Sequence, residues 1–127
     1  MKSKRNIVYL SHGGGPMPLL GDPDHYEMVE TLKEIASEID KPSAILVVSA
    51  HWEARLPTVT SGTNPGIIYD YGGFPQAAYE IEYPAPGEPV LAKRVMNSLK
   101  ENGIDAVQDE QRGFDPVSYT HLTLPTI

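Results

Sequence analysis

The stretch Ser43–Ala50 constrains the fold more than any other, because its apolar residues are typical of a buried strand and His51 follows directly. The stretch Asn6–Leu10 has the same character and is followed, one residue later, by His12. Parallel strands bring the residues after their carboxyl ends to one edge of a sheet, where ligands bind. We therefore expect His12 and His51 to lie together at that edge and to bind a metal ion.

Helical periodicity fills the intervals between the strands. One helix is predicted over residues 23–39, and another runs from Pro89 to just before Gly103, which is a favoured C′ residue. Weaker strands are predicted over residues 56–61 and 104–107. Alternating strands and helices predict an α/β fold with a mostly parallel sheet flanked by helices. The two apolar stripes are Met28, Leu32, Ile35 and Ile39, and Leu91, Val95 and Leu99.

The composition excludes several classes of protein. The chain has 127 residues and no cysteine, so disulfides, thiolate zinc sites and cysteine nucleophiles are absent, and any metal must be held by His, Asp, Glu or water. A net charge of −7 argues against nucleic acid as a partner. No apolar run is long enough for a membrane span or a secretory signal, which predicts a cytoplasmic protein with no membrane partner.

Two histidines leave a metal short of protein ligands, and the local sequence offers further donors. Neutral imidazole suits Fe(II), Zn(II) or Mn(II). A histidine that follows a single strand is more often a hydrogen-bonded structural residue than a ligand, and this alternative stays open for each one. The candidate third ligands are Asp22, Asp24, His25 and Glu53.

The glycine run after His12 admits several interpretations. An oxyanion-hole loop of a lipase-like hydrolase would require a Gly-x-Ser-x-Gly elbow, and a phosphate-binding loop would require Gly-Lys followed by Ser or Thr; the sequence contains neither. A tight turn with positive φ angles is the structural alternative. We favour a turn that brings backbone and substrate close to a metal on His12, which places Gly13 in the substrate pocket.

Aromatic residues gather in a later stretch and supply a candidate pocket wall. Such a set is usually core or loop packing, but around a metal it can enclose a flat aromatic substrate. Tyr71 and Phe74 are the residues that we expect to line this substrate pocket. The full set is Trp52, Tyr69, Tyr71, Phe74 and Tyr79.

Residues 116–127 differ in character from the rest of the chain. They contain no Asp, Glu, Lys or Arg, and the codons GTC TCT TAT ACA CAT CTG ACG CTG CCG ACG, which resemble a sequencing-library adaptor, translate to Val117–Thr126 in order. We therefore expect residues 1–115 to be native and residues 116–127 to be a non-native tail that packs poorly and leaves His121 without a function. A native edge strand rich in Thr, Leu and Ile is the alternative.

Ordered motifs run through residues 6–115. They are Ser11-His12-Gly13-Gly14-Gly15-Pro16, Ser49-Ala50-His51-Trp52-Glu53, Tyr69-Asp70-Tyr71-Gly72-Gly73-Phe74-Pro75, Tyr83-Pro84-Ala85-Pro86-Gly87 and Arg112-Gly113-Phe114-Asp115. Together they resemble the class III extradiol ring-cleavage dioxygenases, and within them the branch of the 4,5-DOPA extradiol dioxygenases. The resemblance implies that His12 and His51 ligate a divalent metal, usually Fe(II) and in some members Zn(II), and that a catecholic substrate is cleaved with dioxygen. It also implies that the chain is the N-terminal part of a larger single domain.

One position departs from the family pattern. In the family, Gly-Phe-Asp is followed by a histidine that serves as the acid/base, whereas Pro116 follows Asp115 here. The resemblance also implies that a further metal ligand lies in a part of the family domain beyond this chain, so we expect the chain as written to be inactive. The alternatives are a zinc-dependent hydrolase that uses His12 and His51, and a non-catalytic metal-binding subunit. The exact substrate, the native metal and the oligomeric state stay open.

Overall fold

Helix α1 (Tyr26–Glu38) forms where the apolar stripe predicts it and continues directly from the 3-10 helix η2 (Pro23–His25). Residues 5–123 are described by this computed structural model of the protein. Leu32 lies on the inner face of α1 and is only 5% exposed. The helix ends at Glu38. The next residue, Ile39, has an extended backbone, and Pro42 disfavours a return to helical backbone just after it.

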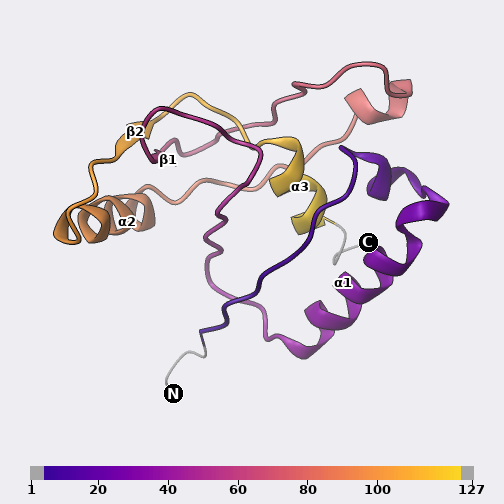
Figure 1. Ribbon diagram of the computed structural model, residues 1–127, viewed down its shortest axis with the longest axis horizontal. Coiled ribbons are helices and arrows are strands. Elements are labelled where there is room, and N and C mark those ends of the chain that lie inside the picture. The colour runs from indigo at the N-terminus through magenta and orange to yellow at the C-terminus, as the bar shows by residue number, and fades with distance from the viewer. Residues whose placement is uncertain (1–4, 124–127) are drawn as a thin grey trace.

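A parallel pair of short strands, joined through a helix, forms one end of the molecule (Figure 1). β1 (Thr58–Thr60) pairs in parallel with β2 (Val107–Asp109), and Thr58 lies opposite Val107. The connection passes through α2 (Pro89–Glu101), which packs against β1. The predicted α/β class, with parallel pairing and a flanking helix, is confirmed, although the last strand begins three residues later than residue 104.

Local signals fix both ends of α2. The Glu88 carboxylate accepts a hydrogen bond from the Val90 N–H at 3.2 Å and so satisfies one free donor of the first turn. At the other end, Gly103 adopts a left-handed φ of 74°. The Ile104 N–H then donates to the Leu99 carbonyl at 2.9 Å, which is the long bond of a Schellman motif. The predicted role of Gly103 at the end of this helix is confirmed.

Neither of the long apolar stretches forms a strand, although both lie within the described residues. Ile7 is 101% exposed and Val48 is 92% exposed, so the prediction that residues 6–10 and 43–50 are buried strands is wrong for this chain. A strand requires a neighbour that pairs with its N–H and C=O groups. In the part of the chain that the structure describes, the only sheet joins β1 to β2, which leaves these two stretches extended and unpaired.

Residues after Asp115 fold into a third helix, α3 (Pro116–Thr123). The Asp115 carboxylate accepts a hydrogen bond from the Ser118 N–H at 3.0 Å and caps the helix in front of its first-position proline. The side chain of Tyr119 is fully buried. Because this segment contains no Asp, Glu, Lys or Arg, its burial desolvates no carboxylate, ammonium or guanidinium group.

This helix corrects one expectation about the tail. Poor packing is wrong for residues 116–122, in which Tyr119 and Thr120 are 0% exposed. Residues 124–127, which belong to the same expectation, lie outside the described residues. The non-native origin of residues 116–127 is a separate matter from their packing, and it stays a prediction.

Helix α3 lies in the middle of the molecule, between α1 and the β1–α2–β2 unit (Figure 1). It contacts the 3-10 helix η1 (Met17–Leu20), which in turn contacts η3 (Gln76–Tyr79). Residues 76–79 thus form a single 3-10 turn that packs beside η1. Among the described residues, no helix combines the length and the apolar character that a membrane crossing requires.

Gly87 packs against the backbone of Gly62, just beyond the carboxyl end of β1. A Cβ at residue 87 would overlap the Gly62 carbonyl oxygen, and a backbone atom cannot yield as a flexible side chain can. We expect Gly87→Ala to lower the free energy of unfolding by about 1–3 kcal/mol, as overpacking usually does. Gly72→Ala is the matched control, because no atom lies within 4 Å of a Cβ at residue 72. Urea unfolding measures both variants, and equal stabilities would contradict this packing.

Candidate functional site

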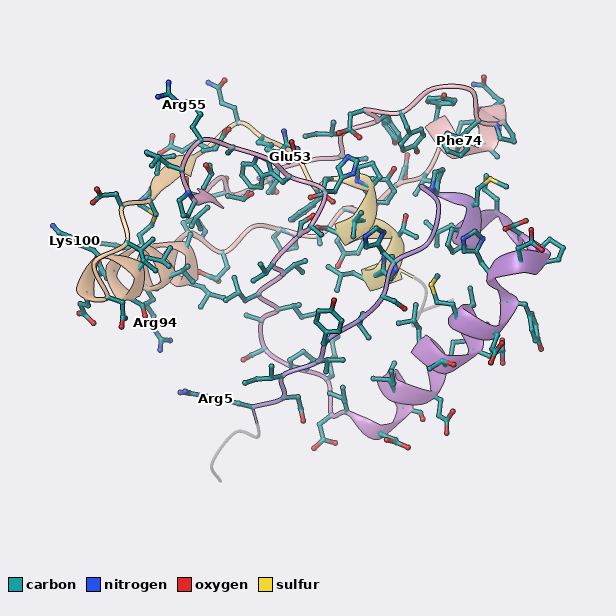
Figure 2. The ribbon with its side chains drawn as sticks, viewed as in Figure 1. Arg5, Glu53, Arg55, Phe74, Arg94 and Lys100 are labelled. Atoms are coloured by element: carbon teal, nitrogen blue, oxygen red, sulfur yellow. The ribbon has the colours of Figure 1, made fainter. Side chains whose placement is uncertain are left out.

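The loop of residues 69–75, which we name the aromatic loop, touches the segments that carry both predicted metal ligands. Its Asp70 carboxylate lies 2.9 Å from Nε2 of His51. Its Phe74 ring packs over Gly15 in the glycine run, where a Cβ would approach the ring to 2.9 Å. Figure 2 shows Phe74 beside the short 3-10 helices, at the end of the molecule away from α2. One loop therefore connects the His51 side chain with the glycine run that follows His12.

His51 and Asp70 form a partly exposed pair, with side-chain exposures of 38% and 36%. An imidazole whose Nε2–H donates to a carboxylate keeps its lone pair on Nδ1, an arrangement that orients histidine ligands in many metal sites. The neighbouring Trp52 ring lies under the Arg112 guanidinium, whose Cζ is 4.5 Å from the ring centroid. These contacts tie the His51 segment both to the aromatic loop and to the segment that precedes α3.

His25 anchors the glycine run. Its Nδ1 is hydrogen-bonded to the Asp22 carboxylate, and its Nε2 accepts the Gly14 N–H at 3.1 Å. Because Nε2 is the acceptor, Nδ1 carries the proton and donates it to Asp22. A Cβ at Gly13 would overlap the His25 ring, so this close approach requires glycine there. Asp22 and His25 are thus engaged with each other and with the loop, and they do not form part of a metal site in this structure.

Tyr71 lies at the centre of an aromatic cluster, and its hydroxyl belongs to a directed chain of hydrogen bonds. Its ring meets Phe74 edge-on, with centroids 5.0 Å apart, and Tyr79 at a tilt, with centroids 5.4 Å apart. The Tyr71 hydroxyl donates to the Ala78 carbonyl at 2.6 Å, which uses its single hydrogen. Its oxygen therefore accepts the hydroxyl of Tyr119, which lies 2.8 Å away.

Burial sets the ionisation of these two phenols. Desolvation raises the pKa of Tyr119 far above its ordinary value, and the hydrogen bond that it donates to Tyr71 raises this pKa further. Burial also raises the pKa of Tyr71, although the hydrogen bond from Tyr119 acts in the opposite direction. Both hydroxyls are therefore protonated at neutral pH and act as neutral hydrogen-bonding groups.

The described residues include side chains of the types that bind divalent metals. The imidazoles of His12 and His51 and the carboxylate of Asp70 are ligand types that Fe(II) or Zn(II) binds. Within the described part of the chain, however, no three such side chains come close enough together to hold a metal ion. The remaining candidates, Asp24 and Glu53, are exposed. The residues present therefore fit a divalent metal in type and fall short in number.

Sequence reasoning proposed His12 and His51 as ligands and Tyr71 and Phe74 as pocket residues, which stay predictions, and it did not name the side chains Asp70 and Tyr119 that contact His51 and Tyr71. His12 is exposed at the start of the glycine run, and its approach to His51 stays a prediction. Asp70 had a usable signal, because it is the only carboxylate in a loop of aromatic residues and glycine. Tyr119 had none, since the segment that carries it was expected to be non-native.

Comparison with known proteins points to one family. The family model described as the catalytic LigB subunit of aromatic ring-opening dioxygenase matches residues 6–116. This range includes His12, His51 and the whole aromatic loop. It ends where the segment with no charged residues begins.

Relatives from several organisms are similar over much of this chain. The dioxygenase tasH of Hapsidospora irregularis is 40% identical over 126 residues, covering 93% of this chain and 39% of that protein. The 4,5-DOPA dioxygenase extradiol of Portulaca grandiflora is 47% identical over 85 residues, covering 66% of this chain and 31% of that protein. The protein of the same name from Beta vulgaris is 38% identical over 129 residues, covering 98% of this chain and 47% of that protein. The chain thus spans less than half the length of each of these relatives.

Removal of the His25 ring should loosen the glycine run. We expect His25→Ala to raise the hydrogen-exchange rate of the Gly14 amide about two- to tenfold, because a net hydrogen bond contributes about 0.5–1.5 kcal/mol. Asp24→Ala is the matched control, since Asp24 is exposed on the same turn of η2. Exchange followed by NMR measures the Gly14 rate. An unchanged rate in the His25 variant would show that this bond does not hold the loop.

The raised pKa of Tyr119 predicts a loss of stability in alkali. An unfolded tyrosine ionises near its ordinary pKa of 10.0 while the buried one stays protonated, so above that pH the unfolded state binds fewer protons. The contribution of Tyr119 to stability is therefore complete below about pH 10 and falls as the pH rises further. Tyr119→Phe should make this fall shallower by up to about 1.4 kcal/mol per pH unit. Urea unfolding across this range measures both slopes, and parallel slopes would contradict the direction of the shift.

Proposed function

Because the chain belongs to the family of the catalytic LigB subunit of aromatic ring-opening dioxygenase, we propose that the protein is a non-haem metal-dependent dioxygenase. It cleaves the ring of a small catecholic substrate with dioxygen, outside the two hydroxyl-bearing carbons, and it works in the cytoplasm. The observation that carries this proposal is the aromatic loop, which contacts both the His51 side chain and the glycine run after His12.

His12 and His51 are the proposed ligands of the metal, which is Fe(II) or Zn(II) in this proposal. When bound, the metal would hold the diol and dioxygen at one centre and polarise both. Asp70 has the role of holding the His51 imidazole in one tautomer, as carboxylates beside metal-binding histidines do. His25 holds the backbone of the glycine run, and so limits where His12 can lie.

Gly13, Tyr71 and Phe74 are the proposed residues of the substrate pocket. The space left by the missing side chain of Gly13 is taken by the His25 ring, so Gly13 contributes its backbone. Tyr71 and Phe74 meet edge-on and offer aromatic surface against which a flat ring can pack. Phe74 also packs over Gly15, so the same ring joins the proposed pocket to the glycine run.

Two parts of the catalytic machinery are proposed to lie outside this chain. A facial site needs one more donor than His12 and His51 supply. Position 116 carries proline, which cannot transfer a proton, where the family resemblance implies an acid/base. The chain also spans only 31–47% of the length of the three relatives above. We therefore propose that the chain as written is inactive and that a longer protein carries the activity.

Turnover distinguishes the chain as written from the product of the longer gene. We expect residues 1–127 to cleave catechol or L-DOPA at least about 10²-fold more slowly, because an acid/base alone contributes about 10²–10⁴-fold. Both proteins are loaded anaerobically with Fe(II), and the yellow ring-opened product is followed by absorbance. His51→Ala in the longer protein is the control and should remove metal binding together with turnover. Comparable rates for the two proteins would overturn the assignment of the missing residues.

Two further results would redirect the proposal. Ester hydrolysis by the Zn(II)-loaded longer protein, without ring cleavage, would favour a zinc-dependent hydrolase. Metal binding without either reaction would favour a non-catalytic metal-binding subunit. Source DNA read beyond the codon for Asp115 provides an independent check, because a histidine codon in place of Pro116 would support the acid/base assignment.

A further inference from the structure

We propose that the aromatic cluster contains a binding site for a phenolic ring, and that Tyr119 of α3 occupies this site as an internal ligand. The phenol site consists of the Tyr69 ring, the Tyr71 hydroxyl and the Ala78 carbonyl behind that hydroxyl. This inference rests on the proposed function in one respect, since a catechol is a ring that carries hydroxyl donors. It names the groups that would recognise such a substrate.

The direction of the hydrogen bonds makes the phenol site selective for a donor. The Ala78 carbonyl can only accept, so the Tyr71 hydroxyl must donate its single hydrogen there, at 2.6 Å. The lone pair that Tyr71 presents on its other side then requires a donor, and Tyr119 supplies it at 2.8 Å. A ring without a hydroxyl would leave this lone pair unsatisfied inside the protein, which is unfavourable.

The walls of the phenol site hold their positions through contacts that do not involve Tyr119. Tyr69, Tyr71 and Tyr79 each donate a hydrogen bond from the ring hydroxyl to a backbone carbonyl. The Tyr79 ring contacts the other two, with centroids 5.4 Å from Tyr71 and 6.4 Å from Tyr69. Tyr119 adds a ring contact with Tyr69 at 6.4 Å and is 0% exposed. The phenol of Tyr119 is therefore enclosed by side chains whose positions are fixed by other contacts.

The occupant and the walls come from different parts of the chain. The walls lie in the aromatic loop and η3, inside the range matched by the family model. Tyr119 lies in α3, beyond residue 116, where that match ends. Residues inside the family match thus form a buried site for a phenol hydroxyl. Tyr119, which lies outside the match, occupies that site.

The phenol site is connected through Asp70 to one of the two proposed metal ligands, His51. Asp70, whose carboxylate lies 2.9 Å from His51, stands in the sequence between the two tyrosines that contact Tyr119. A catechol in place of the Tyr119 ring would donate one hydroxyl to Tyr71 and pack its ring beside Tyr69. The class of ligand is therefore a phenol or catechol with a free hydroxyl.

Rescue of a cavity variant tests the phenol site without any metal. Tyr119→Ala should lower the unfolding temperature and leave space for a ring, as removal of large buried side chains does. Phenol and catechol should bind the metal-free variant saturably and raise its unfolding temperature. Anisole has the same ring but no hydroxyl donor, so it should bind about two- to tenfold more weakly. Titration calorimetry and thermal unfolding measure these effects.

Two control variants separate a phenol site from a general cavity. Tyr119→Phe keeps a ring in place and should bind no phenol. Leu32→Ala opens an apolar space beneath α1 and should not prefer phenol to anisole. Equal affinities of Tyr119→Ala for phenol and anisole, or no saturable binding, would overturn the proposal. If this variant folds only with a ligand, recovery of helical circular dichroism with phenol alone supports the site, and no recovery overturns it.

The binding experiment and the turnover experiment have separate outcomes. Phenol binding is measured on metal-free protein, so loss of the metal site does not affect it. Rescue by phenol without turnover by the longer protein would reject the dioxygenase function and keep the phenol site. Turnover without rescue would keep the dioxygenase function and reject the phenol site.

Discussion

The hydroxyl of Tyr71 joins the aromatic loop to two helical segments of this structure. It donates to the Ala78 carbonyl of η3 and accepts from Tyr119 of α3, so two helical segments that are far apart in the sequence meet at one oxygen. A buried polar group without a partner costs about 1–3 kcal/mol. The aromatic loop that carries this hydroxyl also contacts the His51 segment and the glycine run, so the arrangement of the candidate site depends on the same satisfied group.

The helices could be predicted because the signals that begin and end them are local. A proline at the first position and Gly103 past the end define α2, and Asp115 with Pro116 gives α3 a similar start, although the adaptor interpretation of that segment concealed it. Strands depend on distant partners. An apolar run such as residues 6–10 or 43–50 becomes a buried strand only if a neighbouring strand pairs with it. In the described part of the chain the sheet contains β1 and β2 alone, and both runs stay exposed.

Candidate site residues could be proposed from the sequence where residue type indicates the chemistry, but not where loop geometry decides which side chains meet. Two histidines that each follow an apolar run are a pattern of residue types that favours metal ligation, so His12 and His51 could be proposed as ligands from the sequence. The support of His51 by Asp70, and of the glycine run by His25, depends on how loops of many residues return to each other. Only a conformation determined by tertiary contacts brings such groups within hydrogen-bonding distance.

The two unpaired apolar stretches also affect how the protein is made. A nascent chain leaves the ribosome at about 5–20 residues per second, so the 32 residues between these stretches (11–42) take about 1.6–6.4 s to emerge. During that time the first stretch, with side chains such as Ile7, has already emerged. In the folded chain neither this stretch nor the second one, which carries Val48, pairs with a neighbouring strand. Extended apolar segments of this kind are what holding chaperones bind, and they are also where chains associate with one another. We expect the yield of folded protein to depend on chaperone supply and on the rate of translation.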